Sequence, residues 1–186
     1  MGMILHSFSA YKGYCLLSPI FHVRGVEVLL IMLKVNQSIV INQPIEEIFT
    51  YMSALENLVD WSGVAISVRK NSPGVMHVGA TVRSTVRFLG RWCDITFEII
   101  EYKPYHYLTI KSIFGGAPCV FCYQFEVLED GRTNVSQDAT IHLIEGILEL
   151  EEPAIASAVR RQLENDLLTL KDILEARTSH ALKEQL

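Results

Sequence analysis

The sequence predicts an α+β protein in which one curved antiparallel sheet of about seven strands wraps around a long C-terminal helix. Three observations predict it. Strand-like segments follow one another through the middle of the chain, the turns between them are short, and an amphipathic helical pattern ends the chain. Strands joined by hairpins are antiparallel, and a sheet with helices on one face is an α+β arrangement. Because long strands twist and coil, the sheet should curve around the helix and leave space between them.

The first regular segments are a strand and two short helices. Residues 35–41 are rich in β-branched side chains, which favour a strand. Pro44 suits the first turn of a helix, and apolar residues at helical spacing predict a short helix over 44–54. A second short helical turn is expected over 55–61.

Six further strands and one long helix follow. The strands are expected over 64–70, 80–89, 91–102, 107–114, 119–128 and 133–143. Turns between them carry Gly90 and the pair Asp130-Gly131, which hairpins favour. Glu151-Glu152-Pro153 predicts a helix start, and apolar residues then recur at steps of three and four to about Arg177. The stretch 144–152 fits either a mobile lid at the cavity mouth or a short helix packed on the sheet edge.

The first 34 residues do not share this regular pattern. They contain neither the roughly 20 apolar residues of a membrane span nor the ordered parts of a signal peptide. We expect an N-terminal extension over 1–34, either disordered or arising from a start codon upstream of a working initiator at Met32. The periodic pattern places one domain over 35–177 and a polar tail over 178–186. A peptide from residues 12–24 of the native protein would contradict the start-codon hypothesis.

Composition excludes several classes of protein. The chain has 186 residues, of which 49% are apolar and 20% charged, which is typical of one globular domain. A net charge of −5 offers no basic stripe, so no nucleic acid is expected as a partner. Cys119 and Cys122 have C-x-x-C spacing but lie within a strand, where positions i and i+3 face opposite sides. We expect packed, reduced cysteines in a cytoplasmic protein, with no metal and no cofactor.

Three carboxylates, Asp94, Glu98 and Glu101, fall within 91–102 and raise the question of an acid–base site. Alternation answers it, because the other set of side chains in this strand is apolar: Cys93, Ile95, Phe97 and Ile99. Burying a lone carboxylate is far more unfavourable than burying a phenyl ring is favourable. Asp94 and Glu98 should therefore face solvent, where Arg83 and Arg87 could pair with them. Glu101 shares the apolar parity but lies at the end of the strand, within reach of water.

The same alternation identifies the side chains that would line a cavity between the sheet and the helix. Most are apolar, and Ser84, Tyr123 and Gln137 could orient a ligand. The expected ligand-binding residues are Trp61, Ser84, Phe88, Ile95, Phe97, Ile110, Phe121, Tyr123, Phe125, Gln137, Ala139, Ile141, Ile155, Val159 and Leu163. None of the inward polar groups is an evident proton carrier at neutral pH, so no catalytic residue is assigned.

Several short motifs occur in a specific order. They are I-V-I-N-Q-P-I-E-E-I-F from residue 39, E-N-L-V-D-W from 56, V-G-A-T-V-R from 78, F-L-G-R-W from 88, E-I-I-E-Y-K-P from 98 and E-D-G-R-T from 129. With the closing Leu-rich helix, they resemble the START-like helix-grip (SRPBCC) superfamily over 35–177, and within it the polyketide cyclase/dehydrase-like group.

This resemblance implies a helix-grip fold and a small hydrophobic or aromatic ligand, such as a lipid, a quinone or a polyketide-like molecule, held between sheet and helix. A minority of the superfamily catalyses cyclisation, dehydration or hydrolysis, with catalytic residues that differ between subgroups. Binding or carrying is therefore the leading hypothesis, and a polyketide cyclase/dehydratase acting on an aromatic or polyketide substrate is the alternative. An interaction module without a ligand is a third possibility. The oligomeric state is not predicted.

Overall fold

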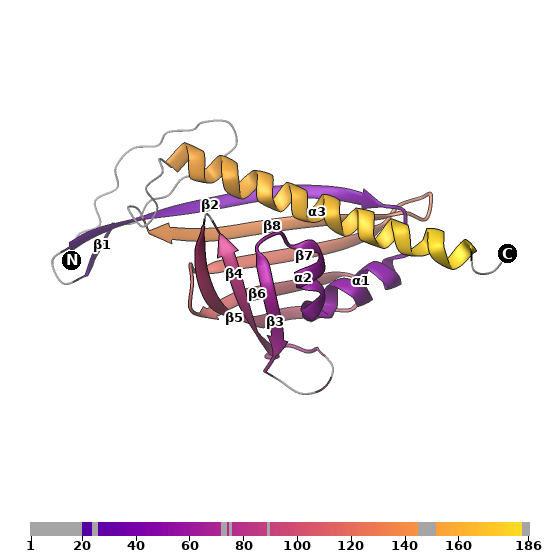
Figure 1. Cartoon of the computed structure of the whole chain (residues 1–186), viewed down its shortest axis with the longest axis horizontal. Coiled ribbons are helices and arrows are strands. Elements are labelled where there is room, and N and C mark those ends of the chain that lie inside the picture. The colour runs from indigo at the N-terminus through magenta and orange to yellow at the C-terminus, as the bar shows by residue number, and fades with distance from the viewer. Residues whose placement is uncertain are drawn as a thin grey trace.

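A curved antiparallel sheet gripped around one long helix makes up the fold (Figure 1). The computed structural model describes residues 20–23, 26–71, 74, 76–88, 90–144 and 152–183. The sheet has the strand order β1-β2-β8-β7-β6-β5-β4-β3. The long helix α3 crosses one face of the sheet, and the short helices α1 and α2 lie on the same side. The expected α+β helix-grip architecture is confirmed.

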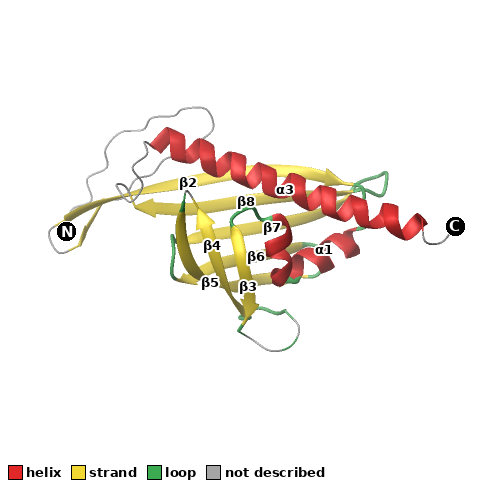
Figure 2. Cartoon of the chain, viewed as in Figure 1, coloured by secondary structure: helices red, strands yellow, loops and turns green. Residues whose placement is uncertain are grey.

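Figure 2 distinguishes the helices of the chain from its strands. Their bounds are β1 Ile20–Val23, β2 Val26–Ile41, α1 Ile45–Ser53, the 3-10 turn η1 Leu55–Asn57, α2 Leu58–Trp61, β3 Ala65–Lys70, β4 Thr81–Phe88, β5 Arg91–Lys103, β6 Tyr107–Phe114, β7 Cys119–Val127, β8 Thr133–Ile144 and α3 Glu152–Lys183.

Two elements are longer than the sequence pattern predicts. β2 begins at Val26 rather than at residue 35, and it pairs with β8 from Leu30↔Ile144 to Ile41↔Thr133. Apolar and polar residues do not alternate before residue 35, so the sequence pattern gives no signal for a strand there. The strand forms because Leu30 and the residues after it pair with β8. The division at residue 34 therefore falls inside β2, and the start-codon hypothesis stays a prediction. At the other end, α3 continues beyond Arg177 to Lys183. The ambiguous stretch at 145–151 lies outside the described residues.

The convex face of the sheet carries the acidic side chains of β5. Arg83 Nη2 donates to Asp94 Oδ2 at 2.7 Å, and Thr85 Oγ1 donates to Asp94 Oδ1 at 2.7 Å. Arg87 lies over the Trp92 ring, 5.8 Å from its centroid, rather than beside a carboxylate. The contact between Arg83 and Asp94 follows the expected facing of β4 and β5. Arg87 lies over Trp92 instead of pairing with a carboxylate, because Trp92 offers its guanidinium group a larger apolar surface.

A bulge in β5 overrides simple alternation near the end of the strand. The register with β6 shifts between Ile99 and Glu101, so Ile99 is buried while Glu101 turns outward. Thr109 Oγ1 donates to Glu101 Oε2 at 2.7 Å. Tyr102 takes the inward direction and packs on Phe49. An extra residue in one strand reverses which side chains face the core, and it does so here.

The core differs between the two ends of α3. At the C-terminal end of α3, called the closed end here, Leu167, Leu170 and Leu174 pack with the apolar face of α1. The buried residues of α1 include Ile48, Phe49 and Met52. At the N-terminal end of α3, called the cavity end because it borders a cavity, Val159 and Leu163 face the strands with Ile155 nearby. They belong to a separate smaller cluster that includes Leu33 and Val35. Within the described residues, no helix is long and apolar enough to cross a membrane.

Candidate functional site

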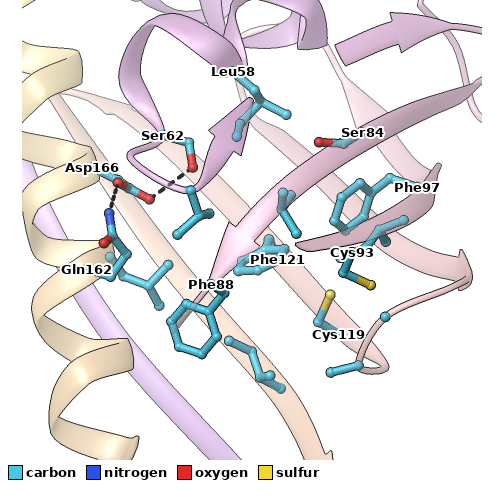
Figure 3. A pocket seen from close by; sticks show the side chains of 18 of the residues that line it. Leu58, Ser62, Ser84, Phe88, Cys93, Phe97, Cys119, Phe121, Gln162 and Asp166 are labelled. Carbon is cyan, nitrogen blue, oxygen red and sulfur yellow. Dashed lines mark hydrogen bonds between the residues drawn. The ribbon is translucent and has the colours of Figure 1, made fainter. Parts of the chain in front are cut away.

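A cavity of about 370 Å³ lies between the cavity end of α3, the α2–β3 connection and the concave side of the sheet (Figure 3). Its walls come from α2, β3 to β8 and α3, so the chain has to fold completely before the cavity exists. Apolar side chains dominate the lining, and the size falls within the range typical of small-molecule sites.

Most of the side chains expected from alternation line this cavity: Trp61, Ser84, Phe88, Ile95, Phe97, Ile110, Phe121, Tyr123, Gln137, Ile141, Val159 and Leu163. Phe125, Ala139 and Ile155 do not line it. Phe125 packs against Phe49, with 5.2 Å between ring centroids, and so belongs to the closed end. Ala139 and Ile155 belong to the small cluster beside β2. Alternation identifies the face of a strand, but it does not say which part of that face is filled by neighbouring side chains.

Strand parity and burial disagree at the end of β7. Val127 shares the parity of Tyr123 and Phe125, yet it is 56% exposed. It is the last residue of the strand and is paired with Thr133 next to the turn. Thr133 itself is fully buried, so strand parity alone does not decide which of the paired side chains is covered.

Aromatic rings stiffen the cavity walls. Trp61 of α2 meets Tyr123 of β7 edge-on, with centroids 6.3 Å apart, and Phe97 meets Phe121 at the same separation. Such edge-to-face pairs hold ring orientations more firmly than burial alone. The walls are therefore preorganised around the cavity.

A chain of hydrogen bonds fixes Tyr123. Gln37 Nε2 donates to Gln137 Oε1 at 2.5 Å, and Gln137 Nε2 donates to the Tyr123 hydroxyl at 3.0 Å. Burial raises the pKa of Tyr123 well above its usual value, and the bond from Gln137 opposes this only in part. Tyr123 is therefore a neutral phenol at physiological pH.

Asp166 on α3 is the polar residue that the sequence interpretation missed. It is 4% exposed and lines the cavity. The Gly63 amide and Gln162 Nε2 each donate to Oδ1 at 2.8 Å, and Ser62 Oγ donates to Oδ2 at 3.2 Å. Figure 3 shows the two side-chain bonds on the α3 side of the cavity. Burial raises the pKa of the Asp166 carboxyl above its ordinary value, although these three donors favour the charged form.

Gly63 lies close against this arrangement. A Cβ atom at residue 63 would lie 2.6 Å from Gln162 Nε2, closer than real contacts allow. The sequence does contain a signal for Asp166, since it lies three residues after Leu163 and four before Leu170, on the apolar stripe of the helix. A carboxylate on such a stripe is uncommon and marks a candidate functional residue.

Two cysteines form part of the opposite wall. Cys93 and Cys119 line the cavity, whereas Cys122 does not. Burial raises the pKa of the Cys119 thiol to about 11. Cys93, Cys119 and Cys122 are all free thiols. In the described part of the chain, no group of three His, Cys, Asp or Glu side chains is placed to hold a metal ion.

The β4–β5 hairpin and the β6–β7 loop border the opening of the cavity. Arg91, Trp92 and Gly116 are exposed and also line the cavity, so they mark where it meets solvent. Trp92 is 62% exposed, as its outward parity predicts, and it borders the cavity because it lies at the end of β5 beside the hairpin turn. An apolar ligand would pass these side chains on entry.

Comparison with known proteins bears on the fold and on the family. The START superfamily protein from Mycobacterium smegmatis superposes with a TM-score of 0.65 at 13% identity, covering 77% of this chain and 97% of that protein. The Zhui aromatase/cyclase from Streptomyces sp. R1128 gives a TM-score of 0.65 at 14% identity, covering 79% and 96%. Ara h 8.0201 gives 0.58 at 10% identity, covering 78% and 99%. At these identities the likeness shows the helix-grip fold alone.

No curated protein matches the sequence. The model of one family does, and it is described as polyketide cyclase / dehydrase and lipid transport. Its match extends over residues 32–175, which includes the C-terminal part of β2 from Met32, every cavity-lining element and α3 to the last leucine of the closed end. The chain therefore belongs to the polyketide cyclase/dehydrase and lipid transport family.

Proposed function

We propose that this protein binds and carries a small apolar or aromatic molecule in the cavity between the sheet and α3, as a cytoplasmic protein. The observation that carries the proposal is a cavity of about 370 Å³ lined mainly by apolar and aromatic side chains. An interior that served only for stability would be filled, because unfilled space forfeits packing contacts. The lipid-transport part of the family description is consistent with this function.

A pair of valine substitutions tests the proposal with pyrene, a wholly apolar fluorescent probe. Val86 lines the cavity and Val127 is exposed on the same sheet. Wild-type protein should bind pyrene and shift its vibronic band ratio toward that of an apolar solvent. Val86→Trp should fill the cavity and weaken binding at least tenfold, whereas Val127→Trp should leave it unchanged. Equal binding by both variants would place pyrene elsewhere and refute the proposal.

A second candidate function is ring closure or dehydration of a polyketide-like substrate. Asp166 favours it, because a buried carboxyl with a raised pKa at the wall of an apolar cavity suits a general acid or base. In this candidate role, Asp166 takes a proton from a carbon between two carbonyl groups. For ring closure, the electron pair left on that carbon forms a bond to a carbonyl carbon further along the substrate, and the carbonyl oxygen takes up the proton. For dehydration, the electron pair forms a carbon–carbon double bond while the β-hydroxyl group takes up the proton and leaves as water.

A substitution at Asp166 separates carrier from enzyme. With a short aromatic poly-β-ketone as substrate, Asp166→Asn should abolish product formation while pyrene still binds. If wild-type protein binds pyrene but leaves such substrates unchanged, the carrier function stands and the enzymatic one is rejected. Product would be followed by liquid chromatography with mass detection, against a protein-free control for spontaneous cyclisation.

A further inference from the structure

We propose that Asp166 and Tyr123 together form a recognition point for a hydroxyl group, so that the ligand is an apolar molecule carrying an alcohol or a phenol. This inference rests on the proposed binding function and identifies the chemical class that the cavity selects. Both side chains line the same cavity, Asp166 from α3 and Tyr123 from β7. They are polar groups in walls that are otherwise largely apolar.

The hydrogen bonds at Asp166 leave one position open. A carboxylate oxygen accepts two hydrogen bonds in good geometry. Oδ1 already accepts from the Gly63 amide and from Gln162, each at 2.8 Å. Among the described residues, Oδ2 accepts only from Ser62, at 3.2 Å. A side chain that is 4% exposed therefore retains one unused position, and the cavity is the space next to it.

Tyr123 offers the complementary group. Its oxygen accepts from Gln137 Nε2, and the Gln137 amide is held in that orientation because Gln37 donates to Oε1. The phenol hydrogen takes no part in that chain. Within the described part of the structure, it is donated to no acceptor. Because burial keeps the phenol neutral, this hydrogen is available to a ligand.

A hydroxyl group satisfies both positions at once. It accepts from Tyr123 and donates to Asp166, and it can also accept from Asp166 when that carboxyl is protonated. An ether or ketone only accepts, and a carboxylate would repel Asp166. A ligand without any polar group would leave the open position on Asp166 Oδ2 and the phenol hydrogen of Tyr123 unused. Sites of this kind reject the analogue that lacks the matching hydroxyl.

Three naphthalene compounds of similar shape test the inference by isothermal titration calorimetry at neutral pH. They are 2-naphthol, 2-methoxynaphthalene, which accepts but cannot donate, and naphthalene, which does neither. Wild-type protein should bind 2-naphthol roughly tenfold more tightly than 2-methoxynaphthalene, as expected for one hydrogen bond to a charged group. Asp166→Asn should reduce this ratio to roughly threefold or less and leave naphthalene binding unchanged.

Two further variants complete the design. Asp172→Asn removes an aspartate from an exposed position on the same helix and should preserve the preference for 2-naphthol. Tyr123→Phe removes the donor without removing the ring, and it should weaken 2-naphthol binding more than naphthalene binding. If Asp166→Asn does not fold, the wild-type ratio and Tyr123→Phe still decide the question.

The outcomes separate this inference from the function on which it rests. If wild-type protein binds all three compounds equally, or if Asp166→Asn and Tyr123→Phe retain the full preference for 2-naphthol, the recognition point is rejected while the cavity remains a ligand site. If neither pyrene nor any naphthalene compound binds, the proposed function fails and the inference fails with it.

Discussion

The C-terminal half of α3 packs into a dense core, whereas the N-terminal half of the same helix covers a cavity. At the closed end, Leu170 is fully buried against the α1 side of the core. Polar contacts tie this end down as well, since Lys171 Nζ donates to the Val40 carbonyl at 2.6 Å and Gln43 Nε2 donates to the Leu174 carbonyl at 2.8 Å. At the cavity end, Val159 and Leu163 face open space.

This difference shows how one regular helix serves two purposes. The apolar stripe runs through both halves. The leucines of the closed end share a core with the rings and aliphatic side chains of α1, whereas at the cavity end α2 lines the open space. Stability concentrated at one end allows space to remain at the other, where each missing contact weakens packing. Asp166 lies between the two halves and provides a polar group at the inner wall of the cavity.

Removing a ring from the closed end should have the largest effect on stability. Phe49 packs against Tyr102, Tyr105 and Phe125 with centroids 5.2 to 5.5 Å apart. Phe49→Ala should lower the free energy of unfolding by about 3–5 kcal/mol, as measured by urea denaturation. Phe88→Ala, at a half-buried ring that lines the cavity, should lower it by less. Equal losses would show that the two ends contribute alike.

A matched pair of leucines on α3 sharpens the same comparison. Leu170 is 0% exposed at the closed end, and Leu163 is 8% exposed at the cavity. Leu170→Ala should lower the free energy of unfolding by about 2–5 kcal/mol. Leu163→Ala should have a smaller effect, because its side chain already borders empty space, and it should enlarge the cavity enough to change pyrene binding. A larger loss for Leu163 would contradict the division.

The pH dependence of stability should reveal the buried carboxyl at the boundary. Because burial raises the pKa of Asp166, the folded protein holds its proton more tightly than the unfolded chain does. This contribution is fully present below the ordinary aspartate pKa of about 3.9 and is lost as pH rises through the raised value. Asp166→Asn removes that dependence. The stability of the variant relative to wild type, measured by urea unfolding, should therefore increase as pH rises from 4, and a constant difference would contradict the raised pKa.

Alkylation by iodoacetamide gives the smallest effect, a difference in rate between neighbouring thiols. With the pKa of Cys119 raised to about 11, its reactive thiolate is scarce at pH 8, so Cys119 should react more slowly than Cys122. Pyrene should slow the modification of Cys93, which lines the cavity, and leave Cys122 unchanged. Peptide mass spectrometry would resolve the sites. Faster reaction at Cys119 than at Cys122 would show that the cavity wall is open to solvent.

The sequence by itself determined the order of the main elements and the facing of most strands. Apolar residues recur every two positions in a strand and every three to four positions in a helix, and both periods are local properties of the sequence. Burial of apolar side chains favours one facing in every strand and helical turn alike. Asp94 was placed in solvent for this reason, and Phe97 and Tyr123 were placed inward. The resemblance in short motifs led to the same family and the same fold.

Only the tertiary structure decided where the inward face is filled and where it is empty. Phe125 and Ile155 have the inward parity but meet neighbours that are distant in the sequence, and the bulge before Glu101 appears only against β6. Likewise, two of the three hydrogen-bond donors to Asp166, Ser62 and Gly63, come from the loop after α2, more than a hundred positions away. A local period records the direction of a side chain, whereas packing and hydrogen bonding depend on segments that meet only when the whole chain has folded.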